Sequence, residues 1–193
     1  MPRIDRQTVL VVDIESTCWK DHKIPEGQRN EIIEVGICTL GIFTGDIDEE
    51  QGILIQPTES KLSEFCTELT GITQTMLDEE GVSFEDACAE LVGDYDAKSR
   101  LWVSWGNYDR RMFQQQCERR GVEYPFADQH CNLKNLFANI YGNRLGMKAA
   151  LDKIKLPLKG RHHRGVDDAV NIASILSFML DKHGYDLLDS FWE

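Results

Sequence analysis

The chain contains 193 residues, of which 41% are hydrophobic and 28% are charged, and it carries a formal net charge of −12. This length suits a single domain over residues 1–193, and no apolar run approaches the length of a membrane span. The composition is that of an ordinary soluble globular protein, and the acidity argues against binding a phosphate backbone through overall charge alone.

The cysteines and the first residues limit the metal chemistry and the compartment. The six cysteines include no C-x-x-C pair, which argues against a zinc site and a redox motif, so we expect free thiols. Residues 1–6 lack the apolar segment of a secretory signal. We therefore expect a cytoplasmic protein that does not insert into membranes.

The stretch from residue 8 to residue 15, TVLVVDIE, predicts a buried strand that ends in two carboxylates. Asp13 and Glu15 are two residues apart, so their side chains share one face of the strand. Two buried anions on one face need compensation, and a hard divalent cation such as Mg²⁺ or Mn²⁺ is the simplest. The alternative is a strand that runs into a solvated acidic turn, which D-x-E alone does not exclude.

Further strands and helices follow in chain order. Residues 31–40 predict a second strand, in which the one internal polar residue, Glu34, is expected to be an edge or hydrogen-bonded group rather than a ligand. Short links between the first three strands predict an antiparallel meander. The other predicted strands are residues 52–56 and 101–105, and the predicted helices are residues 61–69, 74–80, 83–91, 110–120, 133–141, 147–154 and 167–180. This order predicts a mixed α/β sheet covered by helices.

Two later acids and one histidine stand near helix starts. Asp109 follows the strand at residues 101–105, and Asp168 lies in the first turn of the last helix, five residues after His163. Each has a simpler explanation when taken alone, because acids in a first turn favour the helix dipole and a lone histidine is commonly structural or on the surface. A basic run at residues 144–164 ends shortly before Asp168. This run is either a solvated face or a phosphate-binding surface.

Taken together, D-x-E at a strand end, D after a later strand and H-x-x-x-x-D opening a final helix resemble the DEDDh group of 3′-to-5′ exonucleases on the ribonuclease-H-like fold. Within that group the chain is similar to the enhanced-RNAi type, which includes the histone mRNA 3′ exonuclease and the KapD-like proteins. The resemblance covers nearly the whole chain and rests on the stretches VVDIESTCW, RNEIIEVGICTL, EFCTELTGITQ, SWGNYDRRMF, CNLKNLF, LGMKAALDKIKLP and GRHHRGVDDAVNIA. It implies a five-stranded mixed sheet flanked by helices.

The resemblance also implies chemical roles. Two Mg²⁺ or Mn²⁺ ions would be held by four acids, which are Asp13, Glu15, Asp109 and Asp168. Glu15 also counts as catalytic, and His163 would act as general base toward the attacking water, for which imidazole has a suitable pKa. The family spacing of five residues between the base and the last acid selects His163 over His162 and Asp168 over Asp167.

By the same resemblance, a second group of residues grips the terminal nucleotide. Phe65 and Tyr108 would stack on the last base, which requires no base identity because every base has a π face, and core packing is the alternative for each. The other implied contacts are Leu69, Thr70 and Gly71 at the sugar, Ser16, Arg110 and His163 at the nucleotide, and Arg161, His162 and Arg164 at phosphate. The chain departs from the family pattern with Ser16 in place of a common Ala and Tyr108 in place of a common Trp, which bears on substrate preference only.

The sequence therefore predicts a metal-dependent 3′-to-5′ exonuclease that shortens single-stranded or short RNA and releases 5′-nucleoside monophosphates. A DNA-preferring exonuclease of the same mechanism is the close alternative, because residue identities do not reveal contacts to the 2′ hydroxyl. A catalytically silent nucleic-acid-binding adaptor and a protein with a purely structural metal are alternatives from other classes. The physiological substrate and the oligomeric state stay open.

Overall fold

The computed structural model describes residues 5–192, and its centre is a five-stranded mixed sheet. The strands are β1 (Asp5–Ser16), β2 (Ile32–Gly41), β3 (Ile47–Leu54), β4 (Arg100–Ser104) and β5 (His130–Asn132), in the spatial order β3-β2-β1-β4-β5. β2 pairs antiparallel with β1 and with β3, whereas β4 runs parallel to β1 and to β5. The predicted meander and the mixed α/β fold class are confirmed.

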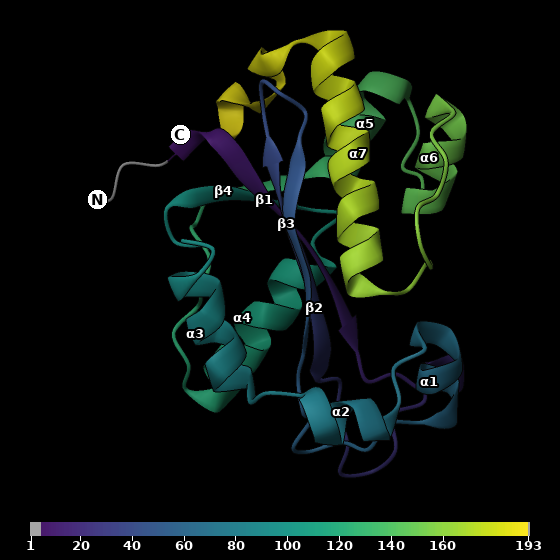
Figure 1. The fold of residues 1–193 in the computed structure, drawn as a ribbon. Helices are drawn as coiled ribbons and strands as arrows, with labels where there is room; N and C mark the ends of the chain where they lie inside the picture. Colours follow the sequence, from purple (N-terminus) through teal and green to yellow (C-terminus); the bar gives the residue numbers. More distant parts are fainter. Residues whose placement is uncertain (1–4, 193) are drawn as a thin grey trace.

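Helices cover both faces of this sheet. They are α1 (Glu64–Thr70), α2 (Gln74–Glu80), α3 (Phe84–Gly93), α4 (Tyr108–Arg120), α5 (Leu133–Tyr141), α6 (Met147–Ile154) and α7 (Gly165–His183), with short 3₁₀ helices at Lys20–His22 and Tyr185–Phe191. Ser63, Thr73 and Ser83 cap the first three helices, each by accepting a backbone N–H three residues later. In Figure 1, α3 and α4 lie on one side of the sheet and α5, α6 and α7 on the other.

β1 separates two hydrophobic clusters because its side chains alternate between the two faces of the sheet. Val9 and Val11 belong to the cluster formed with α5, α6 and α7, whereas Leu10 belongs to the cluster formed with α3 and α4. Asp13 and Glu15 continue the alternation of Val9 and Val11. Both acids are therefore on the face that α7 covers.

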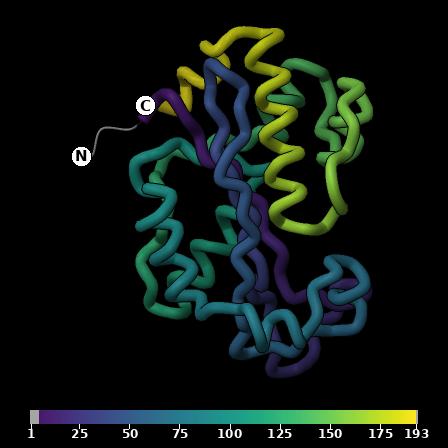
Figure 2. The backbone as a smooth tube through the Cα atoms, viewed as in Figure 1, coloured from purple at the N-terminus to yellow at the C-terminus, as the bar shows by residue number. Residues whose placement is uncertain are grey.

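The two ends of the described chain lie near each other, as the backbone trace shows (Figure 2). The guanidinium carbon of Arg6, on β1, is 5.8 Å from the ring centre of Trp192. Among residues 5–192, no helix combines the length and the apolar character needed to cross a membrane. The opposite end of β1, where its acids are, is the end nearer α1 and α2 in Figure 1.

The structure differs from the prediction mainly at element boundaries. β3 begins at Ile47 rather than at residue 52, because residues 48–51 are exposed and mostly acidic yet still pair with β2 at the sheet edge. β5 has only three residues, too few for an alternating pattern, and was not located in the sequence. α4 begins two residues earlier than predicted, and α7 begins at Gly165 rather than at residue 167. Asp109 therefore lies in the first turn of α4 rather than before it, and Asp168 lies in the first turn of α7 as predicted.

Candidate active site

Three carboxylates meet at the end of β1. One oxygen each from Asp13, Glu15 and Asp168 can be chosen so that all lie within 4.8 Å of one another. Asp13 and Glu15 come from β1, and Asp168 comes from the first turn of α7, the helix packed on the same face. Glu15 is 8% exposed and Asp168 is 4% exposed, so these two acids are buried. The structure brings together the predicted ligands.

Asp109 reaches the same place from the first turn of α4. Its side chain is 4% exposed, and its Oδ1 accepts a hydrogen bond from the backbone N–H of Ile14 at 3.2 Å. Because Ile14 lies between Asp13 and Glu15, this bond attaches α4 to the acidic end of β1. All four acids line one cavity of about 370 Å³.

Burial raises the pKa of each of these four acids, and repulsion by neighbouring carboxylates raises it further at Asp13 and Glu15. Burial, and then the charges of Asp168 and Glu34, raise the pKa of Glu15 to about 8, and burial raises the pKa of Asp109 to about 6. Burial is also the largest cause of the raised pKa values of Asp13 and Asp168. A cation in the cavity would favour the charged forms, and an all-oxygen donor set selects a hard ion. The residues fit Mg²⁺ or Mn²⁺.

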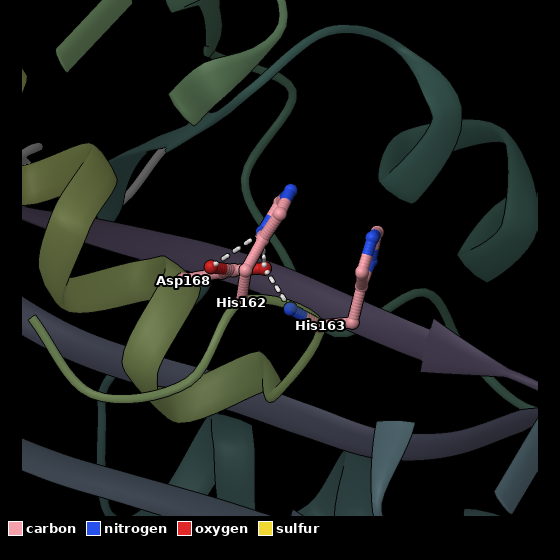
Figure 3. Close-up of side chains that lie close together, drawn as sticks. All are labelled: His162, His163 and Asp168. Atoms are coloured by element: carbon pink, nitrogen blue, oxygen red, sulfur yellow. Dashed lines mark hydrogen bonds and ion pairs between the residues drawn. The ribbon is translucent and has the colours of Figure 1, made fainter. Parts of the chain in front are cut away.

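Two histidines stand in the loop before α7, with their rings stacked at a centroid distance of 4.0 Å (Figure 3). Nδ1 of His162 lies 3.1 and 3.0 Å from the two carboxylate oxygens of Asp168. His163 instead donates its backbone N–H to Asp168 Oδ2 at 2.9 Å, and its ring stands beside the His162 ring without bonding to that acid (Figure 3). Burial, and then the charge of His162, lower the pKa of His163. The His163 imidazole is therefore suited to accept a proton near neutral pH.

Five of the predicted nucleotide contacts line the cavity: the two histidines described above, His162 and His163, and also Ser16, Leu69 and Tyr108. The hydroxyl groups of Ser16 and Tyr108 share a hydrogen bond of 2.8 Å, which joins the end of β1 to the start of α4. Tyr108 is 44% exposed and so offers a ring face to solvent. A half-exposed aromatic ring beside buried acids is a suitable stacking surface for a terminal base.

The other predicted contacts are placed differently. Phe65, which is 37% exposed, and Arg110 are outside the set of described residues that line this cavity. Thr70 is fully buried, and its hydroxyl donates to the carbonyl oxygen of Cys66 at 2.9 Å and accepts the N–H of Ile72 at 3.1 Å. The Thr70 side chain thus closes the end of α1.

The predicted phosphate-binding arginines both make protein contacts. Nη2 of Arg161 donates to the carbonyl oxygens of Glu68 and Leu69 at 2.9 and 3.4 Å, which connects the histidine loop (residues 159–164) to the end of α1. Nη2 of Arg164 lies 3.2 Å from Glu34 Oε1. A phosphate role for either arginine stays a prediction.

Sequence reasoning underestimated Glu34 and did not single out part of the cavity wall. Glu34 is hydrogen bonded, as expected, but β2 lies between β1 and β3, so Glu34 is not on an edge strand. The further lining residues are Ile14, Cys18, Trp105, Gly146 and Met147. Each lies in one of the motif stretches named above, but side-chain chemistry alone gave no reason to select the apolar ones.

Comparison with known proteins identifies the family. The model of the RNase_T exonuclease family matches residues 10–176. Human ERI1 exoribonuclease 3 is 35% identical over 182 residues, which covers 86% of this chain and 52% of that protein. The 3′-5′ exonuclease Snipper of Drosophila melanogaster is 30% identical over 193 residues, which covers 89% of this chain and 69% of Snipper. The chain spans only 28% and 29% of the ERI1 exoribonuclease 2 proteins of Xenopus laevis and Mus musculus.

Solved structures agree with this match. The nuclease domain of 3′hExo, a DEDDh family member bound to rAMP, is similar with a TM-score of 0.83 at 28% identity, over 92% of this chain and 93% of that one. A 3′-exonuclease in a structure of histone mRNA stem-loop recognition has a TM-score of 0.82 at 27% identity, over 92% of this chain and 83% of that one. The resemblance and the ribonuclease-H-like fold are confirmed: this chain belongs to the RNase_T exonuclease family, in the DEDDh group of 3′-to-5′ exonucleases.

Proposed function

We propose that this chain is a divalent-metal-dependent 3′-to-5′ exonuclease that shortens single-stranded or short RNA and releases 5′-nucleoside monophosphates. The observation that carries the proposal is the cavity that four acids, three of them buried, line together with an imidazole. The relatives and solved structures named above are exonucleases of this type, and the ligand rAMP in the 3′hExo structure favours RNA.

The acids of the cavity would hold the cofactor. Asp13, Glu15, Asp109 and Asp168 supply oxygen ligands for two Mg²⁺ or Mn²⁺ ions from β1, α4 and α7. When bound, such ions offset the charge that develops on the phosphate and on the leaving 3′ oxygen. Hydrogen bonds from the backbone hold two of these carboxylates in place: Asp109 accepts from Ile14 on β1, and Asp168 accepts from His163.

His163 would take the proton of the attacking water on an imidazole nitrogen. Its pKa is lowered by burial, so the ring is neutral and ready to accept at neutral pH. Its backbone bond to Asp168 holds the histidine loop against α7. His162, whose Nδ1 faces Asp168, instead contributes to the orientation of that acid.

The residues at the side of the cavity would hold the terminal nucleotide without identifying its base. Tyr108 offers a ring face, Ser16 orients that ring through the shared hydrogen bond, and Leu69 supplies an apolar contact. A preference for RNA requires contacts to the 2′ hydroxyl. A DNA-preferring enzyme with the same chemistry is the second candidate.

The decisive experiment uses RNA and DNA of one sequence, labelled at the 5′ end or at the 3′ end, with Mg²⁺, Mn²⁺ or EDTA. We expect a ladder of 5′-labelled RNA that shortens from the 3′ end with either metal, immediate release of the 3′ label as a mononucleotide, and no reaction in EDTA. A faster reaction on DNA would reverse the substrate preference. RNA binding without degradation under any metal would contradict the enzyme and favour a catalytically silent adaptor.

A further inference from the structure

Glu34 is a fifth acid beside the four that line the cavity. It stands on β2 directly opposite Glu15 on β1, and its side chain is fully buried. Opposite residues of an antiparallel pair project to the same face, where like charges are destabilising. The charge of Glu34 is also among the causes that raise the pKa values of Asp13 and Glu15. Simple packing needs no carboxylate here, so the partners of Glu34 must account for it.

Those partners belong to the start of α7. Oε2 of Glu34 accepts the backbone N–H of Gly165 at 2.8 Å, and Oε1 accepts from Nη2 of Arg164 at 3.2 Å. Arg164 occupies the N-cap position of α7 and makes no capping bond with its own side chain. Glu34 therefore caps α7 from a strand that is far away in the sequence, with the charge that the positive end of a helix dipole favours.

Glycines let this helix start touch the sheet. A Cβ on Gly36 would lie 1.8 Å from the carbonyl carbon of Gly165, and a Cβ on Gly52 would lie 2.6 Å from Oε1 of Glu34. The backbone of α7 thus rests directly on β2, and the Glu34 carboxylate fills the space beside Gly52. The backbone contact between Gly36 and Gly165 and the hydrogen bond from Gly165 to Glu34 together fix the distance between the start of α7 and the sheet.

We propose that Glu34 is a positioning residue, which holds the first turn of α7 so that Asp168 and His163 meet the acids of β1 in working geometry. Asp168 is three residues after Gly165, and it accepts the backbone N–H of His163 two residues before Gly165, so a shift of this turn moves both. The inference rests on the proposed exonuclease function of the same site. Glu34 acts through Gly165 and Arg164.

The test compares Glu34→Gln with Glu34→Ala. Both remove the same charge, but only Gln can still accept the Gly165 N–H from the same distance. We expect Glu34→Ala to lower kcat by about 10²-fold, as misplacement by roughly 1 Å does, with little change in KM. We expect Glu34→Gln to stay within about 10-fold of the wild type, since it keeps one of the two bonds. Equal losses in the two variants would assign Glu34 a purely electrostatic role and overturn the proposal.

A second readout does not depend on turnover. Mn²⁺ binding, followed by the electron paramagnetic resonance signal of the free ion, should weaken about 10-fold more in Glu34→Ala than in Glu34→Gln, because only Ala displaces Asp168 from the other ligands. Equal Mn²⁺ affinities in both variants would contradict positioning even if RNA were degraded. If the wild-type chain degrades no RNA, but Mn²⁺ still binds more weakly to Glu34→Ala than to Glu34→Gln, the proposed function is refuted and the positioning role stands.

Met179→Ala provides the control for general loosening of the helix. Met179 is fully buried on α7, 14 residues after Gly165 and near the other end of the helix, so its loss destabilises α7 without touching the first turn. Rates are compared at a temperature where every variant is fully folded by circular dichroism. Met179→Ala should keep the wild-type kcat. A kcat loss in Met179→Ala as large as in Glu34→Ala would show that any destabilisation of α7 suffices, and would overturn the proposal.

Discussion

The two walls of the cavity are built differently. The acidic wall consists of Asp13, Glu15, Asp109 and Asp168, which are joined to backbone groups of other elements or packed under α7. The nucleotide wall consists of Ser16, Leu69 and Tyr108. The exposed Tyr108 ring is held by a single hydrogen bond to the Ser16 hydroxyl. The exposed Arg161 links the end of α1, next to Leu69, to the histidine loop. Three of the four acids are buried and the acidic wall is held by the fold, whereas the nucleotide wall joins the buried Ser16 to a Tyr108 ring that is 44% exposed.

This difference matches two kinds of task. Stabilising charge in a transition state requires groups that are already in place, because reorganisation during the reaction is costly. Gripping a nucleotide of any sequence requires a surface that stacks and adapts. Changes to the acidic wall should therefore act on kcat, and changes to the nucleotide wall should act on KM.

The largest expected effect comes from the acidic wall itself. Asp168→Asn should lower kcat by at least about 10³-fold, because it removes a metal ligand and charge stabilisation at once. The fold should persist and the metal-free protein should melt at a higher temperature, since one of the repelling anions is gone. Asp181→Asn, an exposed change at the other end of α7, is the matched control and should leave the rate unchanged. Near-normal activity in Asp168→Asn would remove this residue from the ligand set.

The histidines should differ in the next largest effect. His163→Ala should lower kcat by about 10²-fold or more through loss of the general base. His162→Ala should cost less, because His162 contacts Asp168 and only helps to orient it. Single-turnover rates on 5′-labelled RNA compare the two. A much larger loss in His162→Ala would exchange their roles.

Metal-free stability should fall as pH rises. The pKa of Glu15 is raised from 4.5 to about 8 in the folded state, so the native protein keeps a proton that the unfolded chain releases within this range. In EDTA, the melting temperature should therefore drop by roughly 5–10 °C between about pH 5 and pH 8. Mg²⁺ should restore more stability at the upper end. Glu15→Gln should flatten the profile, and a wild-type melting temperature that rises over this interval would contradict the assignment.

The smallest effect is expected at the nucleotide wall. Tyr108→Ala should raise KM about 10-fold with a modest change in kcat, since stacking on one base contributes roughly 1–3 kcal/mol. Tyr108→Phe keeps the ring and loses only the bond to Ser16, so its KM should stay within about 3-fold of the wild type. Steady-state kinetics on one RNA decides. If Tyr108→Ala lowers kcat by a larger factor than it raises KM, the assignment of KM effects to the nucleotide wall and kcat effects to the acidic wall is wrong.

The sequence predicted the acidic wall better than the nucleotide wall for a physical reason. Acids at strand ends and helix starts are individually common, but the DEDDh pattern gives their combination and order, which is specific. The contacts of Arg161 depend on how α1 lies against the histidine loop, which no local pattern encodes. The same is true of Glu34: its hydrogen bonding was expected, but the partner at Gly165 follows only from the topology.

The position of Asp168 in the chain has a consequence for synthesis. The other three acids are supplied by β1 and α4, but the fourth belongs to α7, which begins only at Gly165. A nascent or truncated polypeptide that ends before α7 lacks the helix that covers the acidic end of β1, and its ligand set is incomplete. Under the proposed function, activity requires that α7 has left the ribosome and docked against β1, so a partly made chain would lack nuclease activity.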